Sequence, residues 1–172
     1  GLLLKSFHKE ERLFIPVERI PQNIIQAFIS AEDKDFYKHF GLDLKATLRA
    51  LLTNIKNIGS GKRLIGASTI TQQVAKNFLL SSEVSYERKI KEAILAVRIE
   101  RAFSKNQILE LYLNEIYLGF KSYGIAAAAL NYFDKSLDNL DLAEAAFLAA
   151  LPKAPNNYNP IYKLEQATAR RN

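Results

Sequence analysis

The chain of 172 residues contains no cysteine and only two histidines. The absence of cysteine excludes disulfide bridges and thiolate sites, and two histidines are too few for a metal site built from imidazoles. No hydrophobic run approaches the roughly 20 residues that a membrane-spanning helix needs. The run Leu2-Leu3-Leu4 is too short for a span or for the apolar part of a signal peptide.

The chain does contain enough apolar residues for one folded domain, together with an excess of positive charge. Hydrophobic residues make up 48% of the sequence, which suffices for a real core in a chain of this length. The net charge is +6. A basic surface suits anionic lipid, nucleic acid or a phosphorylated substrate, and it is equally typical of a plain solvated surface.

Periodicity and capping signals predict an all-α fold. Helix starts are indicated by a proline, an aspartate and two capping boxes, namely Pro21, Asp43, Ser104 with Gln107, and Asp141 with Glu144. Helical spacing of apolar residues adds further candidates over 69–78, 86–101 and 126–132. The helix at 86–101 is the clearest, with Ile90, Ala93, Ile94 and Val97 on one side.

Two short segments depart from the helical pattern. A weak strand signal covers residues 13–15. The segment 57–63 has two glycines and two cations between helices, which is typical of a mobile basic loop or of an ordinary connector. Around this loop, over 51–65, apolar side chains alternate with Lys56, Lys62 and Arg63. If the chain acts at a membrane surface, this region is the candidate for peripheral binding, and its apolar residues could equally pack on the core.

Three polar blocks concentrate chemically useful side chains, at 32–41, 66–77 and 88–92. Glu32 follows an apolar helix, where partial burial would raise the pKa of its carboxyl group, so it is the candidate general base. The alternative is a surface glutamate that pairs with Lys34 or Lys38. Asp33 is expected to orient neighbouring cations, and His39 to be structural.

The second and third blocks offer groups suited to sugars and phosphates. Hydroxyls and amides that can recognise sugars come from Ser68, Thr69, Thr71, Gln72, Gln73 and Asn77. A helix that starts near residue 69 would also present free N–H groups to a phosphate, whereas simple N-capping by Ser68 is the structural alternative. Cations that could neutralise an anion are Lys76, Arg88 and Lys89, and each could instead be a solvated helix charge.

These blocks resemble ordered motifs of the family 51 glycosyltransferases, the peptidoglycan transglycosylase domains of class A penicillin-binding proteins and their monofunctional relatives. The motifs are Glu32-Asp33…Phe36…His39…Gly41, Ser68-Thr69-Ile70-Thr71-Gln72-Gln73, Arg88-Lys89…Glu92, Ile108 to Asn114, Leu151 to Pro155 and Tyr158-Asn159-Pro160. The match runs from about Ile20 to Pro160. Where the family commonly has Tyr-Phe-Gly-Lys, this chain has Asp134 in place of glycine, which a left-handed turn tolerates.

The resemblance implies a fold, a reaction and a set of residue roles. The fold would be lysozyme-like, with a core lobe and a smaller mobile, membrane-facing lobe at about 50–68 within one domain spanning 1–172. The reaction would be polymerisation of lipid II into glycan strands, with inversion and release of undecaprenyl pyrophosphate. Glu32 would be the base and Glu92 the second essential carboxylate, which holds cations or a divalent metal such as Mg²⁺ or Mn²⁺. Arg49 aligns with an arginine near the donor phosphate.

The resemblance also implies partners and a place in the cell. Expected ligands are lipid II, the lipid-linked growing chain and moenomycin-type inhibitors, with no nucleic acid. The chain would work on the outer, periplasmic face of the bacterial cytoplasmic membrane. We interpret it as an excised fragment that an anchor would precede and that a transpeptidase domain could follow.

Two other functions compete with this one. A lytic muramidase-like hydrolase would use Glu32 as general acid on the same polymer, but glycan hydrolysis has no phosphate that the cations would need to neutralise. A non-catalytic basic helical module would use the +6 charge to bind membrane or nucleic acid. Cations that interleave with carboxylates, without forming one stripe, argue against that module.

Overall fold

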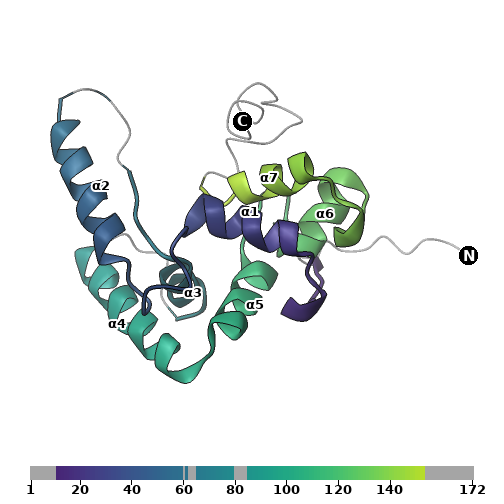
Figure 1. Cartoon of the computed structure of the whole chain (residues 1–172), viewed down its shortest axis with the longest axis horizontal. Helices are drawn as coiled ribbons and strands as arrows, with labels where there is room; N and C mark the ends of the chain where they lie inside the picture. The colour runs from purple at the N-terminus through teal and green to yellow at the C-terminus, as the bar shows by residue number, and fades with distance from the viewer. Residues whose placement is uncertain (1–10, 60, 62–64, 80–84, 154–172) are drawn as a thin grey trace, which may run out of the picture. The chain divides into compact units, whose positions relative to one another are not determined.

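The structure is a computed structural model that describes residues 11–59, 61, 65–79 and 85–153 (Figure 1). Helices account for most of these residues, which confirms the predicted all-α class. The α-helices are α1 (Gln22–Glu32), α2 (Leu44–Lys56), α3 (Ile70–Leu79), α4 (Tyr86–Ala102), α5 (Lys105–Glu115), α6 (Ile125–Phe133) and α7 (Leu142–Ala150). Two 3-10 helices, η1 (Val17–Arg19) and η2 (Leu137–Asn139), and two strands, β1 (Glu11–Arg12) and β2 (Ser122–Tyr123), complete the described elements.

The chain forms two compact units, one of residues 32–112 and one of residues 1–31 with 113–172. The mobile lobe predicted at about 50–68 falls inside the unit 32–112, and residues 60 and 62–64 lie outside the described residues. The motif residues Ala154, Pro155 and 158–160 lie outside them as well. The lysozyme-like arrangement and the mobility of the lobe therefore stay predictions.

Capping groups fix the helix starts of the unit 32–112, largely where the sequence places them. The Asp43 carboxylate accepts from Ala46 N at 2.8 Å at the start of α2. At α5, Ser104 N donates to Gln107 Oε1 and Gln107 N donates to Ser104 Oγ, as the predicted capping box requires. These bonds satisfy first-turn N–H groups that have no partner within their own helix.

The apolar side of α4 was expected to face the core, but in the structure it faces outward. Ile90 and Ile94 are 63% and 50% exposed, whereas Glu92, Ala96 and Glu100 are buried. The helix itself was predicted correctly, but its inward face is polar. The reason lies in α3, which packs along α4 and meets it with polar groups of its own, so the buried charges have partners.

A glycine allows the loop that follows α1 to approach α4 closely. Gly41 has a φ of +83°, and a Cβ atom there would lie 3.0 Å from the backbone carbonyl group of Ala96. Any side chain would therefore clash, and the positive φ would add strain. The loop 33–43 is thus held against α4 by backbone contact.

The unit of residues 1–31 and 113–172 has an alanine-rich core. The first turns of α6, Ala126 to Ala129, are buried, and α6 packs against α7. The α7 helix starts at the predicted capping box of Asp141 and Glu144, and it ends at Ala150, just before Pro152. The predicted left-handed turn is confirmed, because Asp134 caps α6 with a φ of 52°.

The strand predicted at 13–15 was wrong by a few positions. Within the described residues, β1 covers Glu11–Arg12 and pairs in parallel with Ser122 and Tyr123. Ile15 does not continue the ladder because the Asn114 side chain takes both of its backbone groups, at 2.7 Å and 2.9 Å. A side-chain amide thus replaces a neighbouring strand.

Candidate active site

A cavity of about 240 Å³ within the unit 32–112 brings several predicted site residues together. The end of α1, one side of α2 and the segment 65–69 line it. Its walls include five predicted residues, Glu32, Asp33, Arg49, Ser68 and Thr69. Residues from two of the polar blocks, together with Arg49 of α2, therefore line one concave space, as a small-molecule site requires.

Glu32 is held at this cavity by a residue of α3. It is the last residue of α1 and is partly buried, and Gln73 Nε2 donates to Glu32 Oε2 at 2.9 Å. An amide donor on one carboxylate oxygen restricts the orientation of the side chain. A carboxylate held in one orientation at a cavity wall is placed as a general base needs to be.

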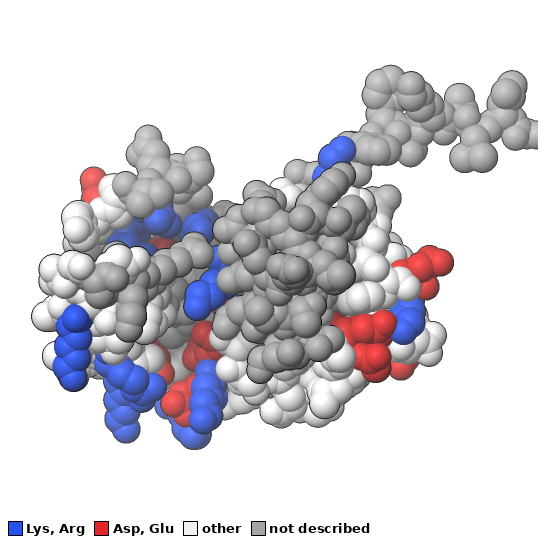
Figure 2. All heavy atoms as spheres, turned by 90° about the horizontal axis from the view of Figure 1, so that it is seen from above, with Lys and Arg blue, Asp and Glu red and all other residues white. Residues whose placement is uncertain are grey.

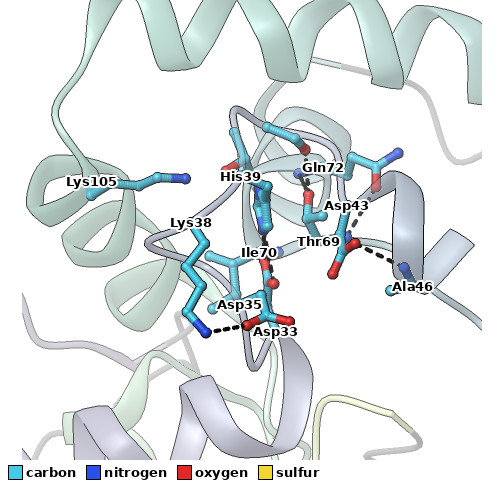
Figure 3. Close-up of polar contacts among 12 residues, drawn as sticks. Asp33, Asp35, Lys38, His39, Asp43, Ala46, Thr69, Ile70, Gln72 and Lys105 are labelled. Atoms are coloured by element: carbon cyan, nitrogen blue, oxygen red, sulfur yellow. Dashed lines mark hydrogen bonds and ion pairs between the residues drawn. The ribbon is translucent and has the colours of Figure 1, made fainter.

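Asp33 is buried, and its carboxylate is hydrogen-bonded to other residues. Its carboxylate oxygens lie 2.9 and 3.0 Å from His39 Nε2, and Ile70 N donates to Asp33 Oδ2 at 2.9 Å (Figure 3). The contacts of Asp33 thus run to a histidine and to the first amide of α3. This geometry agrees with the structural role expected for His39, while the substrate-binding role of Asp33 stays a prediction.

The start of α3 is closed by its own capping box. Gln72 N donates to Thr69 Oγ1 at 3.1 Å, and Thr69 N donates to Gln72 Oε1 at 3.0 Å (Figure 3). The Thr69 hydroxyl also donates to Gly41 O at 2.6 Å. The capping residue is therefore Thr69, whereas the sequence suggested Ser68. The amides of Ile70 and Gln72 already have partners, so they do not form the open phosphate cradle considered from the sequence.

A buried carboxylate gathers two cations on α4. Glu92 is only 1% exposed, Arg88 Nη1 lies 3.2 Å from it, and Lys89 Nζ lies 2.5 Å from it. Lys89 Nζ also donates to Ser68 Oγ at 2.9 Å. Because Ser68 lines the cavity, this bond joins the Glu92 cluster to the wall that faces Glu32.

The remaining predicted residues lie outside this cluster. Lys76 and Asn77 are exposed on α3, four and five positions after Gln72, and neither lines the cavity. Arg49 is exposed on α2 and does line it. The substrate-binding roles of these residues stay predictions. Tyr112, within the motif Ile108 to Asn114, is 1% exposed and belongs to the core.

The sequence analysis missed two residues behind the site, Glu100 and Lys105, and it named Thr71 for its hydroxyl without the partner that the structure shows. Thr71 Oγ1 donates to Glu100 Oε1 at 2.6 Å, and Lys105 Nζ lies 2.7 Å from the same oxygen. The available signal was the charged side of the predicted helix at 86–101, on which Glu92 and Glu100 both lie. That signal was overlooked because the apolar side was taken as the buried one.

The divalent cation that the resemblance allows finds no ready set of ligands here. Among the described residues, no group of three or more histidines, aspartates or glutamates is placed to hold a metal ion. The Glu92 carboxylate already has two cationic neighbours, which would repel a metal. These residues therefore do not fit a metal held by Glu92 itself.

Comparisons with known proteins agree on the family. The family model described as transglycosylase matches residues 1–172. Penicillin-binding protein 1A of Rickettsia felis is 55% identical over 171 residues, which are 99% of this chain and 22% of that protein. Penicillin-binding protein 1A of Escherichia coli K12 is 48% identical over 172 residues, 100% of this chain and 20% of that protein.

A solved structure and the relatives' lengths complete the comparison. The crystal structure of penicillin-binding protein 1A from Haemophilus influenzae has 28% sequence identity and a TM-score of 0.49, over 94% of this chain and 14% of that one. The chain spans about a fifth of the length of the curated relatives it matches. With the family model matched over the whole sequence, the chain belongs to the transglycosylase family.

Proposed function

We propose that this chain polymerises peptidoglycan glycan strands from lipid II. The observation that carries the proposal is the cavity where the Glu32 carboxylate, oriented by Gln73, meets a wall whose Ser68 hydroxyl is bonded to a cationic cluster. A general base and a group that neutralises an anion, both at one small cavity, suit a transfer reaction whose leaving group is anionic.

The reaction would proceed in one displacement. The 4-hydroxyl of the GlcNAc of lipid II loses its proton to Glu32 as its oxygen attacks C1 of the MurNAc of the lipid-linked donor. The bond from C1 to the pyrophosphate oxygen breaks, and that oxygen keeps the electron pair. Inversion at C1 follows because no covalent sugar–enzyme intermediate forms.

The departing undecaprenyl pyrophosphate needs charge neutralisation more than a proton. Lys89 is about half exposed, and its ammonium lies within hydrogen-bond distance of the Ser68 hydroxyl, which lines the cavity. Arg88 is more enclosed and, with Glu92, fixes the cluster. Lys76, Asn77 and Arg49 would serve the same anion from exposed positions. A moenomycin-type phosphoglycolipid would bind here by resembling the donor.

A polyprenyl-linked substrate requires that the site lie at a membrane surface, which we propose is the outer face of the bacterial cytoplasmic membrane. Among the described helices none is long and apolar enough to span a bilayer. Apolar side chains along α2 are instead 52% to 74% exposed, namely Leu44, Leu48, Leu51, Leu52 and Ile55. Lys45 and Lys56 lie on the same helix. An exposed apolar stripe with cations favours peripheral binding to anionic lipid.

The competing functions have less support. Among the described residues on the face drawn in Figure 2, acidic side chains stand beside basic ones, which disfavours a nucleic-acid-binding module. A muramidase-like hydrolase would leave the Arg88–Lys89–Glu92 cluster without a phosphate to neutralise. Because the relatives are about five times longer, a transpeptidase domain in the same protein is part of this proposal.

One assay separates the three functions. The protein is incubated with labelled lipid II in detergent or vesicles, and the product is then digested with a muramidase. A polymer that the muramidase cuts to disaccharide units supports glycosyl transfer. Degradation of added glycan without polymerisation would favour the hydrolase, and no turnover of either substrate by folded protein would favour the binding module.

A further inference from the structure

We propose that Glu100 is a positioning residue that sets the rotation of α3 through Thr71, and thereby holds Gln73 against the general base. The part of this inference that concerns Gln73 and the general base rests on the function proposed for Glu32. Glu100 lies outside the cavity wall, and its carboxylate reaches the site only through other residues.

The Glu100 carboxylate sits where two elements meet α4. The Thr71 hydroxyl donates to Glu100 Oε1 at 2.6 Å, and the Thr71 side chain is fully buried. Lys105 Nζ, at the first residue of α5, lies 2.7 Å from the same oxygen. The Glu100 side chain is 3% exposed, so both contacts are made away from water. A hydrogen bond to a charged acceptor in such surroundings is strong and directional.

The bond acts on the turn of α3 that carries the site contacts. Ile70 precedes Thr71 and donates its N–H to Asp33, while Gln73 follows two positions later and donates to Glu32. If α3 rotated about its axis, both contacts would be lost together, because all three residues belong to one rigid turn. The Thr71–Glu100 bond opposes that rotation from the far side of the helix.

The same carboxylate also steadies the loop that follows Glu32. Lys105 Nζ lies 4.4 Å above the centre of the Phe36 ring, and a Cβ atom at Gly41 would lie 3.2 Å from Glu100 Cγ. The Glu100 side chain therefore lies beside Gly41, where it leaves no room for a larger residue, and it is linked to Phe36 through Lys105. The loop 33–41 and α3 are thus both linked to one buried carboxylate.

Stability alone does not explain a buried charge here. Replacing a buried ion pair by well-packed apolar residues is often neutral or stabilising, so apolar side chains would hold α3 on α4 equally well. An apolar interface would, however, let the helix slide or rotate by small amounts. A displacement of about 1 Å at a reacting group can reduce a rate about 100-fold, which makes a directional bond useful at this position.

The test uses Thr71→Val, which keeps the shape of the side chain and removes the hydroxyl. Thr71→Ser restores the hydroxyl, and Thr47→Val is the matched control because the Thr47 hydroxyl bonds Asp43 O on the exposed side of α2. Two quantities are measured: the NMR signals of the Gln73 side-chain amide, and kcat and KM for lipid II. We expect Thr71→Val to shift the Gln73 signals and to lower kcat about 10- to 100-fold, with KM changed less than about threefold.

Thr71→Ser should recover the Gln73 signals and most of kcat, and Thr47→Val should match wild type. A folded Thr71→Val protein with wild-type Gln73 signals would overturn the inference, whether or not its melting temperature falls. If Thr71→Val does not fold, Glu100→Gln is judged by the same criterion, because its amide is a weaker acceptor for Thr71 Oγ1. The NMR readout needs no turnover, so failure of wild type to polymerise lipid II would reject the proposed function separately.

Discussion

The Lys89 ammonium donates to the Ser68 hydroxyl at 2.9 Å, although the two residues are 21 positions apart in the chain. This bond connects the buried Glu92 cluster on α4 to the wall of the cavity that holds Glu32. It therefore links the two carboxylates considered for catalysis without placing them in contact. In the proposed reaction, Lys89 would be one of the cations that neutralise the leaving pyrophosphate.

Replacing the proposed base should abolish turnover and keep the fold. Glu32→Gln retains the shape of the side chain but cannot take the acceptor proton, so polymerisation of lipid II should fall by about 10²–10⁴-fold. The melting temperature should stay close to that of wild type. Glu18→Gln, at an exposed position in η1, is the control and should polymerise normally. Near-normal turnover by folded Glu32→Gln protein would remove Glu32 from the mechanism.

Removing the bridging cation should weaken binding of a pyrophosphate-bearing ligand. Lys89→Met keeps much of the side-chain length, and the loss of affinity should shrink as the salt concentration rises because the lost interaction is electrostatic. Lys76→Ala and Arg88→Ala should act in the same direction. Lys91→Met is the matched control on α4, since Lys91 pairs only with the exposed Glu87 in the contacts that the structure gives it. Equal affinities for Lys89→Met and Lys91→Met would show that Lys89 is merely a helix charge.

Asp33 should matter for stability far more than its neighbour Asp35. Asp33→Asn disturbs the contacts with His39 and Ile70 N, and we expect the free energy of unfolding to fall by about 1–3 kcal/mol. Asp35 is more exposed, and the adjacent Lys38 ammonium lowers the pKa of its carboxyl group. Asp35→Asn should nevertheless leave the urea midpoint nearly unchanged, because exposed ion pairs contribute little. Similar urea midpoints for the two variants would contradict the placement of Asp33.

The exposed stripe on α2 should carry membrane binding. The double variant Leu48→Ser, Leu52→Ser should remain in solution when vesicles containing anionic lipid are sedimented at moderate salt, whereas wild type should pellet. Leu142→Ser, at an exposed position at the start of α7, is the control and should pellet like wild type. Of the positions expected from the sequence to bind membrane, Leu64 lies outside the described residues and Ile65 is exposed. Unchanged sedimentation of the double variant would place the membrane contact elsewhere.

Alkaline pH should destabilise the protein partly through Tyr132. Burial raises the pKa of the Tyr132 phenol to about 12 from the usual 10. A phenol whose pKa is higher in the folded state stabilises the fold fully below about pH 10, and that contribution is lost as the pH rises through 12. Between pH 10 and 12, the melting temperature of Tyr132→Phe should therefore fall less than that of wild type. Its melting temperature at pH 7 should be lower, because the bond from the Tyr132 hydroxyl to Leu118 O is gone. Identical slopes above pH 10 would exclude this contribution.

Local signals in the sequence predicted the helices well, because caps act over three or four residues. Asp43, Ser104 and Asp141 each begin a helix as expected. The start of α3 was less certain from sequence, since Ser68 and Thr69 are both good caps and only the Gln72 side chain distinguishes them. The strand at Glu11–Arg12 was misplaced because its partner, Ser122–Tyr123, is more than 100 positions away in the chain.

The family motifs name several residues that line the cavity. They do not predict the contacts that site residues make with distant parts of the chain. Glu32, Ser68 and Arg49 line one cavity as the motifs suggested. The engagement of Asp33 with Ile70 N, and of Lys89 with Ser68, joins residues 37 and 21 positions apart. No periodicity signals such bonds. The burial of Glu100 was missed for the opposite reason, because a strong apolar pattern on α4 pointed to the wrong side of the helix.

The outward-facing isoleucines of α4 have a practical consequence for engineering the protein. A redesign that ranks surface positions by sequence would keep Ile90 and Ile94 as core and would freely replace Glu92 and Glu100. Replacing either glutamate alone would leave its buried partners unpaired and would destabilise the fold, whereas changes at the two isoleucines would hardly affect folding. Solubilising changes at Ile90 and Ile94 are therefore available without touching the packed interior, whereas the acidic positions of the same helix should be left alone.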